Sequence, residues 1–222
     1  MFNVCPHCGL YTETKEIHRR AGALSLAVCP HCGHEHPFRQ LPLFVLTGAS
    51  GAGKTAVGLE LVDARLRAEP WVPDCVYLEQ DILWRDEFAD PESDYRAFRN
   101  LWLRMAKNLG QGGRPVVLGG SAVPEQLEAC PERRYFAAIH CLALICDDEL
   151  LRERLVARPE WRHSGSAAFL DRMIAFNRWF REKGQLTQEI VLLDTSALSV
   201  RETARQVAGW IDSCLQKGYV PA

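Results

Sequence analysis

The most informative segment of the chain reads Gly48-Ala49-Ser50-Gly51-Ala52-Gly53-Lys54-Thr55. It fits the pattern G-x-x-x-x-G-K-[ST] at every fixed position. The apolar run 43–46 leads into it as a buried strand, and residues 56–62 continue from it with helical spacing. Glycines here let several backbone N–H groups point into one concavity at the positive end of a helix. The segment therefore predicts a phosphate-binding loop, or P-loop, for a nucleoside triphosphate.

The pattern assigns roles to its members. We expect Lys54 to reach the β- and γ-phosphates and the Thr55 hydroxyl to coordinate Mg²⁺. A glycine-rich turn that carries the pattern by chance is the alternative, and the flanking strand and helix argue against it. ATP and Mg²⁺ are thus the predicted ligands. The backbone around the phosphates is expected to come from Gly48, Ser50, Gly51, Ala52 and Gly53.

Length and composition describe an ordinary globular protein. The chain has 222 residues, of which 47% are hydrophobic and 24% charged, with a formal net charge of -2. Such a balance lacks the basic field of a dedicated nucleic-acid binder. Apolar runs stay well short of the roughly 20 residues of a membrane span, and cysteines stand where a signal peptide needs an apolar stretch. We expect a cytoplasmic protein with no membrane partner.

Two cysteine pairs near the start of the chain share one motif. Cys5-Pro6-His7-Cys8-Gly9 recurs as Cys29-Pro30-His31-Cys32-Gly33, which gives the spacing C-x₂-C-x₂₀-C-x₂-C of a zinc site. A segment this short cannot fold on apolar burial alone, so bound metal would stabilise it. A disulfide framework or a redox dithiol is the alternative, and either fits a reducing compartment poorly. Residues 1–38 thus resemble a zinc ribbon, with structural Zn²⁺ held by Cys5, Cys8, Cys29 and Cys32.

The role of this ribbon stays open at the level of sequence. His34 and His36 are possible substitute ligands, although four cysteines already complete a zinc site. A structural or oligomerising role is the simplest expectation, and docking of RNA or of another protein is the alternative. Short strands at 10–12 and 24–28 are expected to carry the two cysteine turns.

Strands and helices alternate through the rest of the chain. Strand-like runs recur at 43–47, 75–79, 115–119, 139–146 and 190–194. Helical patterns lie near 53–68, 94–109, 147–157, 167–182 and 199–216. This order predicts an α/β fold over residues 43–222, a three-layer α/β/α domain with a five-stranded parallel sheet. Ligands of such sheets bind at the carboxyl ends of the strands, so candidate site residues should follow each strand.

The residues that follow the second strand resemble those of the small P-loop kinases, the gluconate, shikimate, adenylylsulfate and nucleotide kinase group. Several of these enzymes end this strand with an acidic-x-Asp motif, which Glu79-Gln80-Asp81 matches. The resemblance implies that Asp81 is the catalytic carboxylate or helps to hold Mg²⁺, and that Glu79 is a supporting metal or substrate contact. Phosphoryl transfer to a hydroxyl is also helped by a positioned base facing the P-loop. Capping of the next helix by Asp81 is the alternative.

An arginine-rich segment follows the fourth strand. Arg154-Leu155-x-x-Arg158 resembles the R-[IL]-x-x-R that opens the lid in adenylate-kinase-like enzymes. By that resemblance Arg154 packs on the adenine and Arg158 reaches the transferring phosphates, with Arg162 a further candidate on a lid of about 158–166. Guanidinium groups on a closing segment can neutralise charge on the γ-phosphoryl group. A solvated arginine face paired with nearby glutamates is the alternative.

Two further strand ends carry predictions. Thr195 follows the last strand, where the same kinases line the adenine pocket, and is a candidate base contact; Asp194 or Ser199 could instead cap the closing helix. The third strand ends in Gly119-Gly120-Ser121 with no Walker-B aspartate, which argues against a motor or regulatory ATPase. These glycines could let a substrate approach the backbone closely.

The acceptor is expected to bind against residues 84–109, where aromatic and arginine side chains suit a flat ring with an anion. A packed helix face explains Tyr95, Phe98 and Trp102 equally well. The leading function is an ATP-dependent kinase, a phosphotransferase for a small acceptor, with a nucleoside or nucleotide favoured. The alternatives are an RNA-end kinase or RNA-associated protein docked by the ribbon, an antibiotic or sugar kinase, and an ATP-dependent switch without chemistry. Nucleic acid is not the favoured partner, and the oligomeric state stays open.

Overall fold

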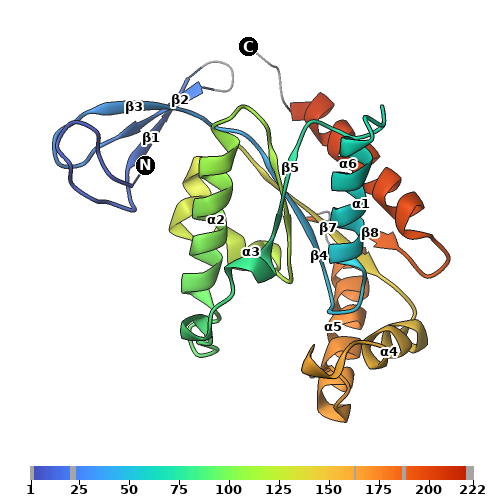
Figure 1. Ribbon diagram of the computed structural model, residues 1–222. Coiled ribbons are helices and arrows are strands. Elements are labelled where there is room, and N and C mark those ends of the chain that lie inside the picture. The colour runs from blue at the N-terminus through green and yellow to red at the C-terminus, as the bar shows by residue number, and fades with distance from the viewer. Residues whose placement is uncertain (1–2, 21–23, 163, 187–188, 219–222) are drawn as a thin grey trace.

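A computed structural model describes residues 3–20, 24–162, 164–186 and 189–218. It contains a small antiparallel sheet and a larger parallel one (Figure 1). The small sheet consists of β1 (Glu16–Arg19), β2 (Leu24–Val28) and β3 (Glu35–Arg39). The large sheet consists of β4 (Leu43–Gly48), β5 (Val76–Glu79), β6 (Val116–Gly119), β7 (Ile139–Ile145) and β8 (Ile190–Asp194).

Helices connect the strands of the large sheet. The α-helices are α1 (Lys54–Leu66), α2 (Arg96–Gly110), α3 (Pro124–Glu128), α4 (Asp148–Val156), α5 (Ala167–Leu186) and α6 (Val200–Gly218). Short 3₁₀ helices are η1 (Gln80–Leu83), η2 (Asp86–Phe88), η3 (Pro131–Tyr135) and η4 (Glu160–Arg162). The described helices are not long and apolar enough for any of them to cross a membrane.

The large sheet has the strand order β5-β6-β4-β7-β8, and every neighbouring pair is parallel. Its central strand β4 is buried along its whole length. Parallel strands need crossover connections, and the crossover helices cover both faces of the sheet. The five predicted strands and the three-layer α/β/α architecture are therefore confirmed, and the P-loop leaves the carboxyl end of the central strand.

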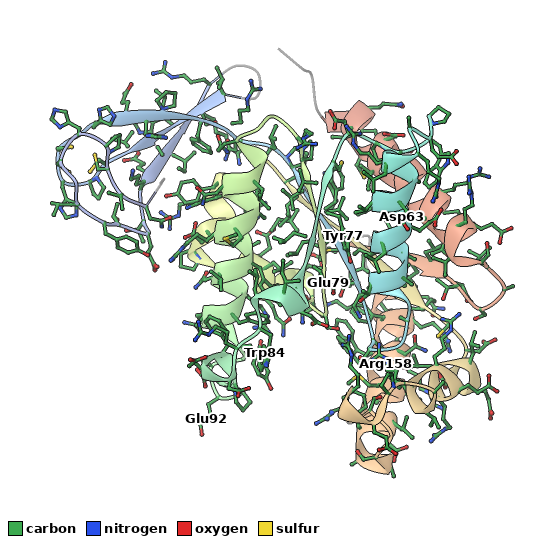
Figure 2. The ribbon with its side chains drawn as sticks, viewed as in Figure 1. Asp63, Tyr77, Glu79, Trp84, Glu92 and Arg158 are labelled. Carbon is green, nitrogen blue, oxygen red and sulfur yellow. The ribbon has the colours of Figure 1, made fainter. Side chains whose placement is uncertain are left out.

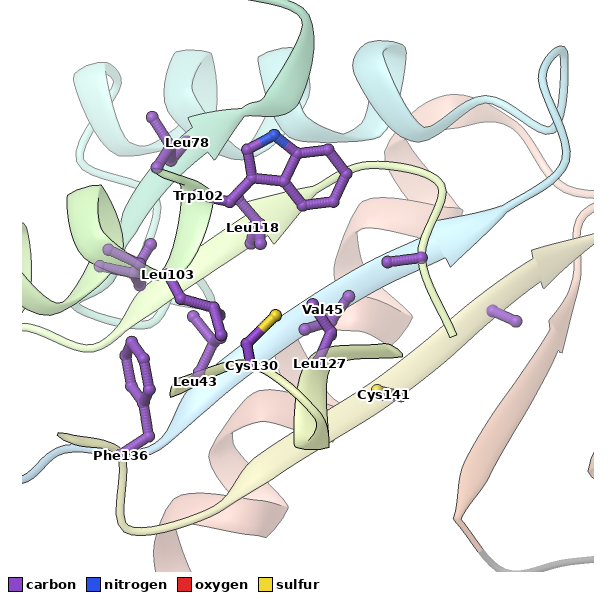
Figure 3. Close-up of a cluster of buried hydrophobic side chains, with 14 of the residues drawn as sticks. Leu43, Val45, Leu78, Trp102, Leu103, Leu118, Leu127, Cys130, Phe136 and Cys141 are labelled. Carbon is purple, nitrogen blue, oxygen red and sulfur yellow. The ribbon is translucent and has the colours of Figure 1, made fainter. Parts of the chain in front are cut away.

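Side chains of β4 alternate between two cores, as the two-residue period of a strand requires. Leu43 and Val45 join the cluster under α2, α3 and α5, which Figure 3 shows in part. Phe44 and Leu46 join the cluster under α1 and α6 on the opposite face. Two buried faces explain why the sequence of this strand is continuously apolar rather than alternating.

The N-terminal ribbon differs from its predicted strand pattern. The strand expected at 10–12 is wrong, because Tyr11 makes only an isolated bridge with Val4. The third strand, β3, covers residues for which the sequence predicted no strand. Each cysteine turn closes on itself: in the first, Cys5 N–H donates to the Leu10 carbonyl at 2.9 Å, and the second repeats this bond. Local closure uses the backbone groups that a strand would have offered to a neighbour.

Candidate active site

The P-loop connects β4 to α1 through a tight backbone path. Gly48, Gly51 and Gly53 have φ values of 134°, 90° and 104°, which side chains rarely allow. A Cβ atom on Gly48 would lie 2.4 Å from the Leu144 carbonyl oxygen. The path brings the loop to the amino end of α1, which begins at Lys54. The geometry is that of an anion site built from backbone amides.

Lys54 lies folded over the loop that precedes it. Its Nζ donates to the carbonyl oxygens of Gly48 at 2.8 Å and Ala49 at 3.0 Å. Burial lowers the pKa of Lys54 to about 8, and the carboxylates of Glu79 and Asp81 oppose that shift. An opposite charge within a few ångströms favours the ammonium form, so a bound phosphate would keep Lys54 protonated.

A nucleotide-sized cleft of about 470 Å³ opens beside the P-loop. Arg154 and Thr195 line it together, and the Arg154 guanidinium donates to the Thr195 hydroxyl at 3.4 Å. The hydroxyl in turn donates to the Ile145 carbonyl at the end of β7. Sequence reasoning missed the rest of this wall, at and before the start of α6, which consists of Leu198, Val200 and Thr203. Ser199 meanwhile caps α6 through a reciprocal bond with Glu202.

Two arginines after α4, Arg158 and Arg162, contact different parts of the site. Arg158 donates to the Ser50 hydroxyl of the P-loop at 2.8 Å, and burial lowers the pKa of its guanidinium. Arg162, in η4, lies 3.5 Å from a carboxylate oxygen of Asp81. The segment 158–162, called the arginine segment below, therefore contacts both the P-loop and the residues that follow β5. Figure 2 shows Arg158 on one side of this edge of the sheet and Trp84 on the other.

The acidic residues after β5 lie in different surroundings. Glu79 accepts a hydrogen bond from the Tyr77 hydroxyl at 2.5 Å. Burial and the nearby Asp81 raise the pKa of Glu79, whereas the Tyr77 bond lowers it. Asp81 is exposed, and no side chain caps η1. Oxygen donors of this kind suit Mg²⁺, which takes few protein ligands beside phosphate and water.

Tyr77 was missed by sequence reasoning, although two glycines mark its position. Its ring fills the space beside Gly58 and Gly119, where added Cβ atoms would lie 1.9 Å and 2.2 Å from it. Gly119 at the end of β6 and Gly120 after it thus accommodate neighbouring side chains rather than a substrate, since Gly120 faces Gln80 in the same way. Gln80 also accepts a bond from the Ser121 amide at 2.7 Å.

A second cleft, of about 850 Å³, lies between α2 and the arginine segment. Phe98 and Trp102 line it and are also buried in the core, so the packed helix face is confirmed, and contact of these side chains with an acceptor stays a prediction. The Trp102 ring nitrogen is buried without a hydrogen-bond partner among the described residues. The lining residues are Gln80, Asp81, Trp84, Tyr95, Phe98, Arg99, Trp102, Ser121, Arg162 and Phe169.

Arg99 is the buried cation of this cleft. The sequence left open whether Arg99 is a surface charge or contacts the acceptor; the side chain is only 6% exposed and pairs with Asp94 at 3.0 Å. Asp94 and Tyr95 both have a φ of 54°, a conformation that non-glycine residues rarely adopt. Asp94 also accepts from Gln126 at 2.9 Å. Strained residues held by several bonds often mark functional sites.

The four predicted zinc ligands come together in the ribbon. Their sulfur atoms lie within 4.8 Å of one another, with Cys5–Cys32 at 3.7 Å and Cys8–Cys29 at 3.8 Å. A tetrahedral site with Zn–S bonds of about 2.3 Å has S–S edges of about 3.8 Å. The cluster therefore has the dimensions of a Zn(Cys)₄ centre. His34 is not one of the clustered ligands; its ring stacks on His7 instead.

No protein-family model matches the chain, and no curated protein matches it. Solved structures do match. An unliganded sugar kinase from Janibacter sp. HTCC2649 has a TM-score of 0.53 and 16% identity, covering 79% of this chain and 95% of its own. A gluconokinase from Sinorhizobium meliloti 1021 has a TM-score of 0.53 and 20% identity, covering 81% and 98%.

A third similar structure is the APS kinase of Mycobacterium tuberculosis in complex with AMPPNP and APS. Its TM-score is 0.52 and its identity 15%, and the match covers 78% of this chain and 98% of that one. Likeness at such low identity establishes architecture and leaves substrate open. Together with the parallel sheet and the P-loop, it confirms the predicted fold: this chain has the fold of the P-loop kinases, preceded by a four-cysteine ribbon.

Proposed function

We propose that this protein is an ATP-dependent kinase that phosphorylates a hydroxyl group of a small acceptor. The observation that carries the proposal is the placement of Asp81 and Arg162 where the second cleft approaches the P-loop. Ser121, from the wall of that cleft, donates to the Gly48 carbonyl at 3.1 Å. An acceptor in the cleft would therefore lie close to the terminal phosphate of a nucleotide on the P-loop.

Each residue of the site has a separate role in phosphoryl transfer. The acceptor oxygen attacks the γ-phosphorus, the bond to the β,γ-bridging oxygen breaks, and ADP leaves. Asp81 takes the proton of the acceptor hydroxyl, while Lys54 and Arg158 neutralise charge on the phosphates. Thr55 and Glu79 would hold Mg²⁺, which would supply further charge neutralisation, and Asp81 is left to act as the base. Positioning and electrostatics account for most of the rate in this chemistry.

A lid is the second element of the proposal. The segment 158–166 carries Arg158 and Arg162, each bonded to a different side of the site. It joins α4 to α5, and among its described residues the short η4 is the only helix. Closure of such a segment excludes water and completes the charge around the γ-phosphoryl group. We assign residues 43–222 to the kinase domain and residues 1–38 to the ribbon.

For the acceptor we propose a nucleoside or nucleotide. The second cleft offers flat apolar surfaces from Trp84, Tyr95 and Phe169, which suit a ring stacked between them. Arg99 provides a cation for an anionic group, and the Trp102 ring nitrogen an unused donor. A sugar or sugar acid is the second candidate, which the similarity to a sugar kinase and a gluconokinase supports.

A screen for ADP release with Mg²⁺ tests the proposal across nucleosides, nucleotides, sugars, sugar acids and short 5′-hydroxyl RNAs. We expect acceptor-dependent turnover that Asp81→Asn lowers by about 10²–10⁴-fold, because a general base is lost. Asp63→Asn is the matched control: the same change on the exposed face of α1 should leave the rate unchanged (Figure 2). Equal rates for the two variants would contradict the role of Asp81. Turnover with RNA alone would overturn the small acceptor.

A further inference from the structure

A buried ionic network joins the ribbon to the helix that lines the acceptor cleft. At its centre, Lys107 of α2 lies 2.5 Å from Glu132 of η3, and both side chains are 1% exposed. Asn3, two residues before the first zinc ligand, completes the pair. Its side-chain oxygen accepts from Lys107 at 2.9 Å, and its side-chain nitrogen donates to Glu132 at 3.2 Å.

Two more contacts hold the same half of α2 to the ribbon. Arg104 donates to Glu132 at 3.0 Å and pairs with Glu13 of the ribbon. At the end of the helix, Gln111 bonds both backbone groups of Arg39 in β3, at 2.8 Å and 3.0 Å. Positions 104, 107 and 111 are spaced three and four apart, so they share one face of the helix. The ribbon therefore contacts α2 at several positions along one face of the helix.

The ribbon contacts depend on the first cysteine turn. The Thr12 amide donates to the Asn3 carbonyl at 2.7 Å, and the Asn3 side chain donates to the Thr12 carbonyl at 3.3 Å. These bonds close the loop that contains Cys5 and Cys8, and Glu13 follows it directly. Metal binding would fix this loop and with it the positions of Asn3 and Glu13. Leaving a buried charge without one of its partners is strongly disfavoured. A change in the conformation of the loop should therefore change the stability of the ionic network on α2.

The other half of α2 forms the wall of the acceptor cleft. Phe98, Arg99 and Trp102 line that cleft. Trp102 and Lys107 are five residues apart on one helix, or about 7.5 Å along its axis. A helix moves as a rigid element over such a distance, so loosening one half alters the wall formed by the other. Nothing equivalent connects the described ribbon residues with Lys54 or Arg154 on the nucleotide side.

We propose that metal binding by the ribbon fixes α2 and thereby sets the affinity of the cleft for its acceptor, with Asn3 and Glu13 as the positioning residues. The effect on the acceptor rests on the proposed kinase function; the effect on α2 does not. The metal acts from a distance, through contacts that exist only when the first cysteine turn is folded. The nucleotide site should be insensitive to it.

Hydrogen exchange of the full chain tests this directly. Zinc content is measured first, and metal is then removed with a chelator under reducing conditions. We expect peptides from α2 to exchange faster without metal, while peptides from α1 and α6 keep their protection. Unchanged protection of α2 in metal-free protein would overturn the proposal. This readout needs no acceptor, so it decides the coupling even if the screen for kinase activity fails.

The double variant Asn3→Ala/Glu13→Gln separates the contacts from the metal. It should keep its zinc, yet show the faster exchange of α2 and a KM for the acceptor raised by about five- to tenfold. The KM for ATP should stay within about twofold, because the coupling bypasses that site. Glu16→Gln, at an exposed position on β1, is the control and should change neither quantity. Equal increases in both KM values would contradict a positioning role.

Discussion

The ribbon and the kinase-like domain are stabilised by different means. In the domain, two large apolar clusters cover both faces of the sheet, and β4 is buried throughout. Among its described residues the ribbon contributes only Ala27 and Phe38, with Ile17 packed against them, to a cluster completed by Tyr135 of the domain. Its four cysteines have the dimensions of a metal centre instead. The ribbon should therefore unfold when metal is withheld, and the domain should unfold when side chains of its apolar core are truncated.

Loss of a zinc ligand should separate the two regions most completely. We expect Cys29→Ser to abolish zinc binding and ribbon structure, because metal binding supplies the folding energy of such segments. ATP binding by the domain should persist with a Kd within about twofold of wild type, since the P-loop draws on a separate core. Zinc analysis and ATP titration measure the two effects.

The control for this variant is Cys75→Ser. Cys75 is a half-buried thiol outside the ribbon, and the same substitution there should leave zinc content unchanged. Retention of one zinc per chain by Cys29→Ser would contradict the four-thiolate site.

The converse variant should lower the rate of phosphoryl transfer and leave the ribbon intact. Lys54→Met removes the ammonium that bridges the P-loop carbonyls. We expect turnover to fall by about 10²–10³-fold, the usual effect of deleting one charge-stabilising donor. Zinc content should not change. Steady-state rates with a saturating acceptor, beside metal analysis of the same samples, make the comparison, and a variant of full activity would refute the assigned role.

Truncation of apolar side chains should distinguish the two cores. Leu118 is fully buried between α2 and the sheet, so Leu118→Ala should cost about 2–5 kcal/mol of unfolding free energy. Ile17→Ala, in the ribbon, should cost about 1 kcal/mol or less, because that side chain is only partly buried. Denaturant unfolding of zinc-loaded protein measures both. Similar losses would mean that the ribbon has an apolar core of its own.

The smallest effect should be a shift in pH dependence. Tyr77 donates to the ionised form of Glu79 and thereby lowers a pKa that burial raises. Tyr77→Phe removes that donor, so the pKa of Glu79 rises further and activity is lost at a higher pH as the solution is acidified. We expect the acid limb of the rate profile to move upward by roughly one unit.

A matched hydroxyl in the ribbon provides the control. Tyr11 donates to Glu13 at 2.7 Å in an exposed position. Tyr11→Phe should leave the acid limb where it is, since Glu13 lies outside the active site. An unchanged acid limb in Tyr77→Phe would remove Glu79 from the list of groups that must be ionised.

Local sequence patterns correctly predicted the structural features that depend on residues close together in the chain. The P-loop, the alternation of strands and helices, and the paired cysteine turns each lie within a short window, and the structure contains all of them. Apart from the strand expected at 10–12, the failures involve distant contacts. Asn3 and Lys107 are 104 residues apart, and Arg99 is buried because α2 packs on the sheet. No local period reveals such pairs, although the glycines at 58 and 119 do mark the niche of Tyr77.

The most direct measurement is transfer of label from γ-³²P-ATP to an acceptor in a single turnover, with wild type and Asp81→Asn compared at equal ATP occupancy. We predict that wild type places the label on the acceptor, and that Asp81→Asn binds ATP normally but transfers it far more slowly. Label released as free phosphate, independent of any acceptor, would contradict the kinase. Equal transfer by the two proteins would show that the carboxylate facing Arg162 is not the base.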